Sequence, residues 1–350
     1  MAYIVGIDEA GYGPNLGPLV VAGTVWSLDQ PGLEGDLYQA LQPEVDGNPD
    51  TPGLTICDSK RLHQAQRGLA RLEENVLAIW SRAARGAPCI RGNWPAEVGC
   101  LSGGALALDW QSLQRARSQA TFWDDDEAGS SIGPPAHDEW YYLLPKKIEL
   151  PVAGCLDRIR QGVEAFDRAT KRAGVSLVRV AFVEISPRQF NELLTRLESK
   201  GTLLTGVSLL LARSLLADCS DRPTHVICDK HGGRNRYGHA IRELLDCRAL
   251  CVESESESTS RYQVSFSDGR PIAWEFRARG ESSLPTALAS MVAKYIRELR
   301  MEAWNRFWRL RVPDVAPTKG YPQDAKRFLE QIRPVLRELQ VPLADVWRNK

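Results

Sequence analysis

Two carboxylates stand side by side near the start of the chain, in the stretch "GIDEAGYGP" at positions 6 to 14. Asp8 and Glu9 follow an apolar, β-branched segment that predicts a buried strand, so both acids lie at its end. A later segment, "THVICDKHGG", predicts another buried strand that ends in Asp229. Ligands gather at strand ends in sheets flanked by helices. Converging carboxylates without Cys or His favour magnesium or manganese, and hence phosphate chemistry.

A fourth carboxylate, Glu298, lies in "LPTALASMVAKYIRELRMEAWNRFWRL", the longest helical pattern of the chain. It follows Met291 by seven residues and Lys294 by four, which places it near the apolar stripe of that helix. Two interpretations fit this position: a ligand for a cation, or an ordinary ion pair with Lys294. The strand-end acids also allow a second interpretation, as solvated caps of their strands.

The acids need a sheet to position them, and the pattern of the chain predicts one. The segment at 16 to 26 predicts a second strand that is antiparallel to the first, because too few residues separate them for a parallel crossover. Further patterns predict a helix at about 63–85 and a strand at 176–186. A helix that starts at Ser186 and Pro187 and another that runs to about Leu216 follow, and then a hairpin at 261–276 and a last helix at 323–340. We therefore expect an α/β fold with a mixed sheet flanked by helices.

The composition limits the function classes. The 350 residues are 43% hydrophobic and 25% charged, which is enough for one large core or two smaller ones. The net charge is zero, so a polyanion partner must meet a local basic patch. The eight cysteines lack zinc spacing and predict reduced thiols. The apolar stretch at 203–219 carries Arg213 and predicts a core helix. We expect a cytoplasmic monomer without a membrane span.

The domain organisation is predicted from a change in amino-acid composition along the chain. Residues 86–174 hold four tryptophans, an acidic run and a turn-rich stretch, and they predict an insertion. The catalytic core is expected at 1–85 and 175–312. Residues 313–350 are expected to form a C-terminal helical segment.

Separate motifs in the same order as in a known family carry a resemblance. "GIDEAGYGPNLGPLVVAG", "CDSKRL", "HVICDKHGG", "ALASMVAKYIRE" and "KGYPQD" resemble segments of the type 2 ribonucleases H, the ribonuclease HII and HIII family. The match covers roughly residues 1 to 84 and 175 to 330. The resemblance implies a ribonuclease-H-like fold and leaves the Trp-rich insertion unmatched. A C-terminal helical extension is expected after the core.

The resemblance also implies an activity. The chain is expected to be an endonuclease that hydrolyses RNA in RNA/DNA hybrids, or at ribonucleotides in duplex DNA, and leaves 3′-hydroxyl and 5′-phosphate ends. By matching position, two Mg²⁺ or Mn²⁺ ions are expected on Asp8, Glu9, Asp229 and Glu298. The fourth position is usually Asp in ribonuclease HII, whereas Glu is used in the HIII branch.

The residues expected to bind the substrate differ more from the family pattern than the carboxylates do. The family's loop commonly reads Gly-Arg-Gly, whereas this chain has Gly11, Tyr12 and Gly13, whose amides can still grip a phosphate or ribose. Tyr321 matches the family's Gly-Tyr-Pro tyrosine at the ribose. The remaining expected substrate contacts are Ser59, Lys60, Lys230 and Arg234.

Each of these substrate contacts also has a structural interpretation. Ser59 and Lys60 fit the first turn of a helix. Lys230 and Arg234 fit a solvated basic loop beside Asp229, and Tyr321 fits an aromatic that packs on the core. Two other functions stay open: a nuclease for a DNA junction or structured RNA, and a binding protein without catalysis.

Overall fold

The computed structural model describes residues 2–29, 36–64, 68–84, 150–197, 199–219 and 222–349. Most of the expected insertion lies outside these residues, so its tryptophans are not discussed further. The strands are β1 (Ala2–Ala10), β2 (Leu19–Leu28), β3 (Val45–Asp46), β4 (Leu54–Thr55), β5 (Val175–Ile185), β6 (Thr224–Asp229), β7 (Ala249–Glu255), β8 (Thr259–Ser265) and β9 (Pro271–Arg277). The helices are α1 (Leu37–Leu41), α2 (Ser59–Gln64), α3 (Gly68–Trp80), α6 (Leu156–Ala173), α7 (Pro187–Arg196), α8 (Lys200–Leu216), α9 (Gly238–Leu245), α10 (Leu284–Arg309), α11 (Pro322–Glu338) and α12 (Leu343–Val346), with a 3₁₀ turn η3 (Gly280–Ser282).

The described residues form a seven-stranded mixed sheet in the order β5-β2-β1-β6-β9-β8-β7. Strand β1 pairs with β2 antiparallel and with β6 parallel, and β6 pairs with β9 parallel. The remaining pairs are antiparallel. This confirms the expected mixed sheet, the antiparallel first pair and the hairpin of β8 and β9. The strand β7 that completes the sheet was missed in the sequence because it is exposed along almost its whole length.

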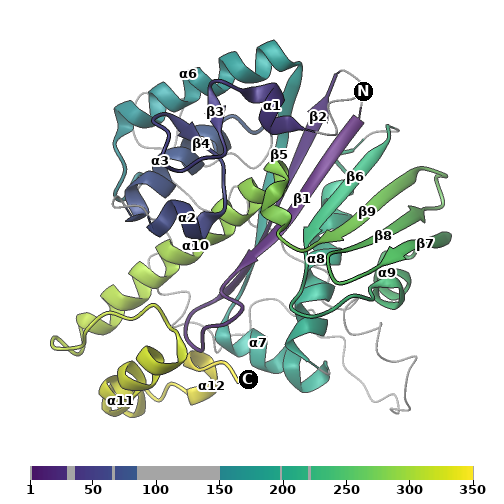
Figure 1. Ribbon diagram of the computed structural model, residues 1–350. Coiled ribbons are helices and arrows are strands. Elements are labelled where there is room, and N and C mark those ends of the chain that lie inside the picture. The colour runs from purple at the N-terminus through teal and green to yellow at the C-terminus, as the bar shows by residue number, and fades with distance from the viewer. Residues whose placement is uncertain are drawn as a thin grey trace, which may run out of the picture.

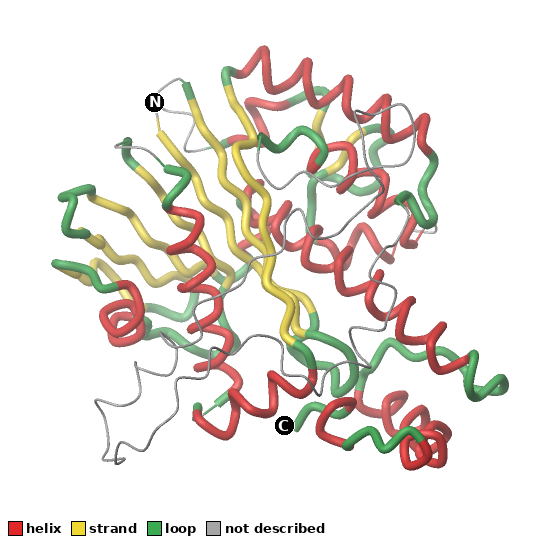
Figure 2. Tube along the Cα trace, turned by 180° about the vertical axis from the view of Figure 1, so that it is seen from behind, coloured by secondary structure: helices red, strands yellow, loops and turns green. Residues whose placement is uncertain are grey.

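Helices cover both faces of the sheet (Figures 1 and 2). Alternate residues of β1 explain how: Ile4 belongs to a core with α3, α6 and α10, whereas Val5 and Ile7 belong to a core with α8 and α9. Because both faces are buried, the strand is apolar throughout instead of alternating. The central strands are thus held rigidly up to the acids at their ends.

Local signals explain the helices on the second face. Ser186 begins α7 with a full capping box, in which its side chain accepts from the amide of Gln189 and the Gln189 side chain accepts from the Ser186 amide. Helix α8 is buried nearly all round, which confirms the expected core helix. Within the described residues, no helix combines the length and the apolar character that a membrane span requires.

Two elements pack across the expected domain limits. Helix α6 lies in the range expected for the insertion, but Ile159, Phe166 and Ala169 are buried in the main core against α3 and β5. Its strongly amphipathic pattern needs such a partner. The C-terminal segment forms a third core in which Phe328 and Ile332 of α11 pack with Trp304 and Trp308 at the end of α10. This segment therefore shares a core with the long helix.

Candidate metal centre

Three of the four expected carboxylates come together at the end of the sheet. Asp8, Glu9 and Asp229 each offer an oxygen, and these oxygens lie within 4.8 Å of one another. The pairing of β1 and β6 explains this, since Ile7 is opposite Cys228 and the next residues of both parallel strands are the acids. Among the described residues this is the one such group of three metal-ligating side chains. The sequence prediction that strand ends bring these acids together is confirmed.

The carboxylates are fixed by hydroxyl and amide donors. Ser290 of α10 hydrogen-bonds the side chain of Asp8, and the Oγ of Ser59 lies 3.1 Å from the Oγ of Ser290. Asp229 accepts a 2.8 Å hydrogen bond from the amide of Gly280 in η3. A Cβ at Gly280 would lie 2.9 Å from the Asp229 Cα, so only glycine allows this approach. Ser59 is buried and contacts Ser290, so the geometry favours a positioning role over the expected contact with substrate.

Helix α10 approaches β1 closely enough to bring Ser290 to the acids. A Cβ at Gly6 would lie 2.2 Å from the carbonyl carbon of Pro285, so the strand and the helix touch backbone to backbone. The hydroxyl of Thr24 in β2 donates a 2.9 Å hydrogen bond to the carbonyl oxygen of Pro285. The first turn of α10 is thereby anchored on two strands.

The electrostatics of the group favour a bound cation. Burial, together with the charges of Glu9 and Asp229, raises the pKa of Asp8 well above its usual range. Burial and the Asp229 charge raise the pKa of Glu9 to about 7, and burial also raises the pKa of Asp229. A divalent cation removes this cost because it neutralises the charges that repel one another. The donor set, carboxylate oxygens only, fits Mg²⁺ or Mn²⁺.

The fourth expected ligand, Glu298, is buried but does not belong to this group. Its Oε1 lies 2.7 Å from the Nζ of Lys294, and its Oε2 lies 2.5 Å from the Nζ of Lys319. The ion pair with Lys294 that the helical spacing allowed is therefore present, and a second lysine joins it. Both oxygens of Glu298 already face ammonium groups, so the residues do not fit a second metal ion at this position.

The glycine loop after β1 is held by two distant parts of the chain. Gly11 has a φ of +91°, and a Cβ there would lie 2.5 Å from the carbonyl oxygen of Pro18. The carbonyl oxygen of Gly320 accepts a 2.8 Å hydrogen bond from the amide of Asn15. At the C-terminal end, the amide of Arg348 donates a 2.8 Å hydrogen bond to the carbonyl oxygen of Asn15. The loop is therefore fixed by tertiary contacts.

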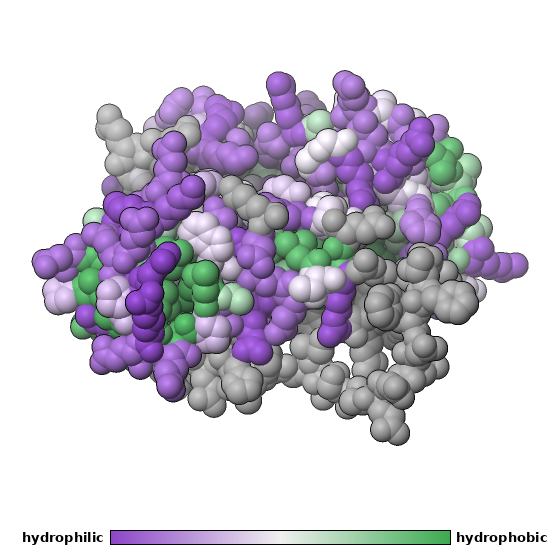
Figure 3. Space-filling view, turned by 90° about the horizontal axis from the view of Figure 1, so that it is seen from below, coloured by the Kyte–Doolittle hydropathy of each residue, from purple (hydrophilic) through white to green (hydrophobic). Residues whose placement is uncertain are grey.

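Tyr321 follows directly after Gly320 and is 52% exposed, so the structure places this side chain at the surface beside the glycine loop. Gly13 is exposed, and nothing lies within 4 Å of the position of a Cβ there. Figure 3 shows the molecule from below the view of Figure 1, the side on which α7, α11 and the C-terminus lie. Its described surface is mostly hydrophilic, with apolar groups between the polar side chains.

Tyr12 turns from the loop toward the N-terminus of α8. The Nζ of Lys200 lies 5.7 Å from the centre of its ring, and the nearby charges of Glu9 and Arg234 act on its pKa, which burial raises. The guanidinium of Arg234 donates a 3.1 Å hydrogen bond to the hydroxyl of Thr202. Arg234 and Lys200 thus bring positive charge to the side of the site that Tyr12 borders.

Lys230 has a different position from the one expected. It is buried, and its Nζ donates to the side-chain oxygen of Asn235 at 2.8 Å, the carbonyl oxygen of Ser256 at 2.5 Å and the hydroxyl of Ser260 at 3.2 Å. These bonds brace the loop after β6, so the ammonium is not available for a substrate phosphate. Its neighbour His231 is also buried, and burial lowers the pKa of this histidine to about 3.

A hollow of about 300 Å³ is lined by residues that include Arg61, Arg279 and Glu281, and the charge of Glu281 raises the pKa of Asp229. Lys60 is exposed, and its charge lowers the pKa of both Glu9 and Asp229. Within the described residues, Lys60, Arg61 and Arg279 have no ion-pair partner closer than 4 Å. This side of the site therefore offers cations to a polyanion.

Sequence reasoning missed several residues that shape the site. Ser290 lies inside the "ALASMVAKYIRE" motif, where its position on the turn before Lys294 was a usable signal. Gly280 carried no signal. Lys319 lies inside the "KGYPQD" motif, but its contact with Glu298 joins segments that are distant in the sequence. Arg279 is unusual because it adopts a left-handed backbone conformation, with a φ of +62°.

Comparisons with known proteins find similar solved structures only, at low sequence identity. No family model and no curated protein sequence matches the chain. Among solved structures, the chain is similar to the PCNA–RNase HII complex from Archaeoglobus fulgidus, with 14% identity and a TM-score of 0.39 over 99% of this chain and 94% of that chain. It is similar to ribonuclease H2 from Pyrococcus horikoshii, with 13% identity and a TM-score of 0.39 over 98% and 92% of the two chains.

A third similar structure is that of Bst-RNase HIII in complex with Mn²⁺. The identity is 14% and the TM-score is 0.39, over 99% of this chain and 66% of that chain. Because these TM-scores are below 0.5, the sheet order and the carboxylate group carry the functional interpretation, and the alignments do not.

Proposed function

We propose that this protein is a divalent-metal-dependent endonuclease that hydrolyses the RNA strand of RNA/DNA hybrids, or duplex DNA at embedded ribonucleotides. The observation that carries the proposal is the group formed by Asp8, Glu9 and Asp229, whose oxygens lie within 4.8 Å of one another at the end of a rigid sheet. Three clustered carboxylates with raised pKa values, of which Asp8 is buried and the other two are partly buried, are costly without a cation. A fold has little physical reason to keep them unless they bind one.

The chemistry of the group matches phosphodiester hydrolysis. When bound there, Mg²⁺ or Mn²⁺ stabilises charge on phosphate oxygens and lowers the pKa of an attacking water. Ser290 and the amide of Gly280 hold Asp8 and Asp229 in place, so these ligands need no rearrangement when the ion binds. The expected products are a 3′-hydroxyl and a 5′-phosphate.

The surroundings of the acids fit a nucleic acid. Lys60, Arg61 and Arg279 lie exposed on one side of the acids, and Arg234 lies on the side bordered by Tyr12. Such cations contact phosphates and position a duplex without reading its sequence. These local charges compensate for the zero net charge of the chain.

The selection of ribose is assigned to the glycine loop and Tyr321. The exposed ring of Tyr321 stands beside the loop because Gly320 is bonded to Asn15. Backbone amides of Gly11 and Gly13 and the tyrosine hydroxyl are groups that can recognise a 2′-hydroxyl, the group that distinguishes RNA from DNA. The sequence motifs that resemble type 2 ribonucleases H support the same substrate class.

The test is cleavage of three labelled duplexes with Mg²⁺ or Mn²⁺: an RNA/DNA hybrid, DNA with one ribonucleotide, and all-DNA. The wild type is expected to cut only at ribonucleotides, and Asp8→Asn is expected to lose at least a thousandfold in rate. Asp36→Asn is the matched control, because it removes an exposed carboxylate at the start of α1 and keeps the oxygen that accepts from Gln39.

The outcomes separate the proposal from its alternatives. Cutting of all-DNA or of structured RNA alone would retain the metal centre and replace the substrate. Binding of the duplexes without cutting, in the presence of bound metal, would indicate a binding protein and overturn the proposed activity.

A further inference from the structure

The carboxylate of Glu298 is held by two lysines from different parts of the chain. Lys294 lies one turn earlier on α10, at a spacing that commonly gives ion pairs. Lys319 comes from the segment that follows α10, and its ammonium lies 2.5 Å from Oε2. Glu298 is only 5% exposed, so this charge is largely shielded from water and needs partners.

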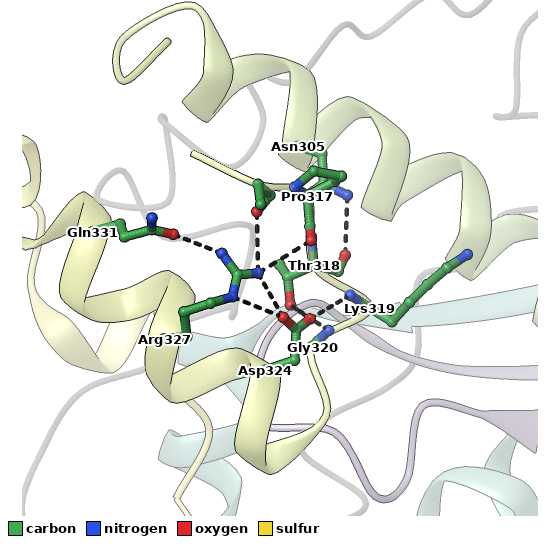
Figure 4. Close-up of polar contacts among 9 residues, drawn as sticks. Asn305, Pro317, Thr318, Lys319, Gly320, Asp324, Arg327 and Gln331 are labelled. Atoms are coloured by element: carbon green, nitrogen blue, oxygen red, sulfur yellow. Dashed lines mark hydrogen bonds and ion pairs between the residues drawn. The ribbon is translucent and has the colours of Figure 1, made fainter. Parts of the chain in front are cut away.

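The position of Lys319 is fixed by a hydrogen-bond network around Asp324 (Figure 4). The hydroxyl of Thr318 and the amide of Lys319 donate to the same oxygen of Asp324, at 2.5 and 3.2 Å. Asn305 of α10 makes two further hydrogen bonds with the Thr318 backbone. In Figure 4 the Lys319 side chain extends away from this network. The hydrogen-bonded backbone at Thr318 and Lys319 thus positions the Lys319 ammonium at the carboxylate of Glu298.

Charge balance distinguishes Glu298 from the other three acids. Asp8, Glu9 and Asp229 carry three carboxylates, and within the described residues no ammonium or guanidinium forms an ion pair with them. The single carboxylate of Glu298 faces two ammonium groups, and the Nη1 of Arg297 lies 4.0 Å from its Oε1. A divalent ion at Glu298 would have to displace a lysine and would then lie within a few ångströms of the other, where like charges repel.

We propose that Lys319 holds Glu298 out of the metal centre, so that the protein binds a single divalent ion at Asp8, Glu9 and Asp229. This inference rests on the proposed metal-dependent activity. Lys319 also precedes Gly320 and Tyr321, which border the glycine loop.

The test is the number of Mn²⁺ ions bound to the full chain, measured by titration calorimetry and by the electron paramagnetic resonance signal of free Mn²⁺. The wild type is expected to bind one ion. Lys319→Met is expected to bind two, because one oxygen of Glu298 becomes available. The double variant Lys319→Met/Glu298→Gln is expected to return to one ion, which would locate the second ion at Glu298.

Two control variants separate this effect from a general change in charge. Lys319→Arg keeps the positive charge and is expected to bind one ion. Lys326→Met removes an exposed lysine of α11 and is also expected to leave one ion. Near-ultraviolet circular dichroism shows whether each variant is folded.

The possible results are distinguishable. Two ions in the wild type that fall to one in Glu298→Gln would overturn the inference and leave the proposed nuclease intact. One ion in Lys319→Met would also overturn it. No Mn²⁺ binding by the wild type would instead reject the metal-dependent function.

Discussion

The hydroxyl of Tyr295 in α10 donates a 2.6 Å hydrogen bond to the carboxylate of Glu73 in α3, which is fully buried. The same carboxylate accepts from three consecutive amides, those of residues 152 to 154, at 2.6 to 2.8 Å. Successive amides that point at one anion form a stable concave site. Glu73 therefore ties α3, α10 and the start of α6 together on the face of the sheet that carries Ser290.

Glu73→Gln is expected to destabilise the protein by roughly 2–4 kcal/mol, because an amide group then faces N–H donors that lose their acceptor. Urea unfolding measures the change. The matched control is Glu74→Gln: Glu74 is partly exposed and accepts from the amide of Cys155 at 3.0 Å, and its loss is expected to stay below about 1 kcal/mol. Equal losses in the two variants would show that the buried network has no special role.

Two glycines of the same loop are expected to respond differently to alanine. Gly11→Ala places a Cβ 2.5 Å from the Pro18 carbonyl oxygen at a positive φ, so it is expected to shift the loop and cost roughly 2 kcal/mol or more. Gly13→Ala is expected to cost less than about 1 kcal/mol, because its Cβ meets open space. If the loop binds substrate, Gly11→Ala also raises KM for an RNA/DNA hybrid. A Gly13→Ala variant less stable than Gly11→Ala would contradict the loop geometry.

Lys230 and Arg234 lie in one loop but are expected to have separable roles. Lys230→Met leaves several oxygens without their buried donor and is expected to lower the free energy of unfolding by roughly 2–3 kcal/mol. Arg234→Met removes a partly exposed side chain with one hydrogen bond to Thr202, so its stability changes little. Its affinity for duplex is expected to fall several-fold at low salt, and less at high salt. Filter binding at two salt concentrations, with unfolding curves for both variants, checks this assignment.

The sequence predicted the parts of the fold that local pattern controls. The run of apolar residues before Asp8, the Ser-Pro start at Ser186 and the long pattern of α10 are each sufficient to define an element. Strand β7 escaped prediction because it is an exposed edge strand, without the alternation that a buried face imposes. Helix α6 was assigned to the insertion because its partners lie in α3, which no local pattern can indicate.

The residues of the candidate site also divide into those that local pattern predicts and those that depend on tertiary contacts. Asp8, Glu9 and Asp229 were predictable because strand ends in neighbouring strands meet at one edge of a sheet. The surroundings of Glu298 were only half predictable: the helical spacing indicated Lys294, whereas Lys319 arrives through a tertiary network around Asp324. The burial of Lys230 and His231 depends on how the loop after β6 packs, which the cationic sequence of that loop did not reveal.

The pH dependence of stability tests the repulsion within the acid group. In the metal-free protein, the pKa of Glu9 rises from 4.5 to about 7, mainly through burial. Between these values the folded chain binds more protons than the unfolded chain, so the free energy of unfolding falls as the pH rises from about 4.5 to about 7. Asp8 and Asp229 act in the same direction. We expect a loss of roughly 1–3 kcal/mol over this range in EDTA.

Bound Mn²⁺ is expected to reverse this slope, because the ion binds the ionised carboxylates and its affinity increases as protons leave. Asp8→Asn removes one of the repelling charges, so in EDTA at about pH 8 it is expected to be more stable than the wild type by roughly 1–2 kcal/mol. The same variant is expected to lose most of the stabilisation by Mn²⁺. Urea unfolding of both proteins at about pH 5 and 8, with EDTA or Mn²⁺, provides the measurement. If Asp8→Asn is less stable than the wild type in EDTA at high pH, the carboxylates are held by favourable contacts in the protein itself and need no metal ion.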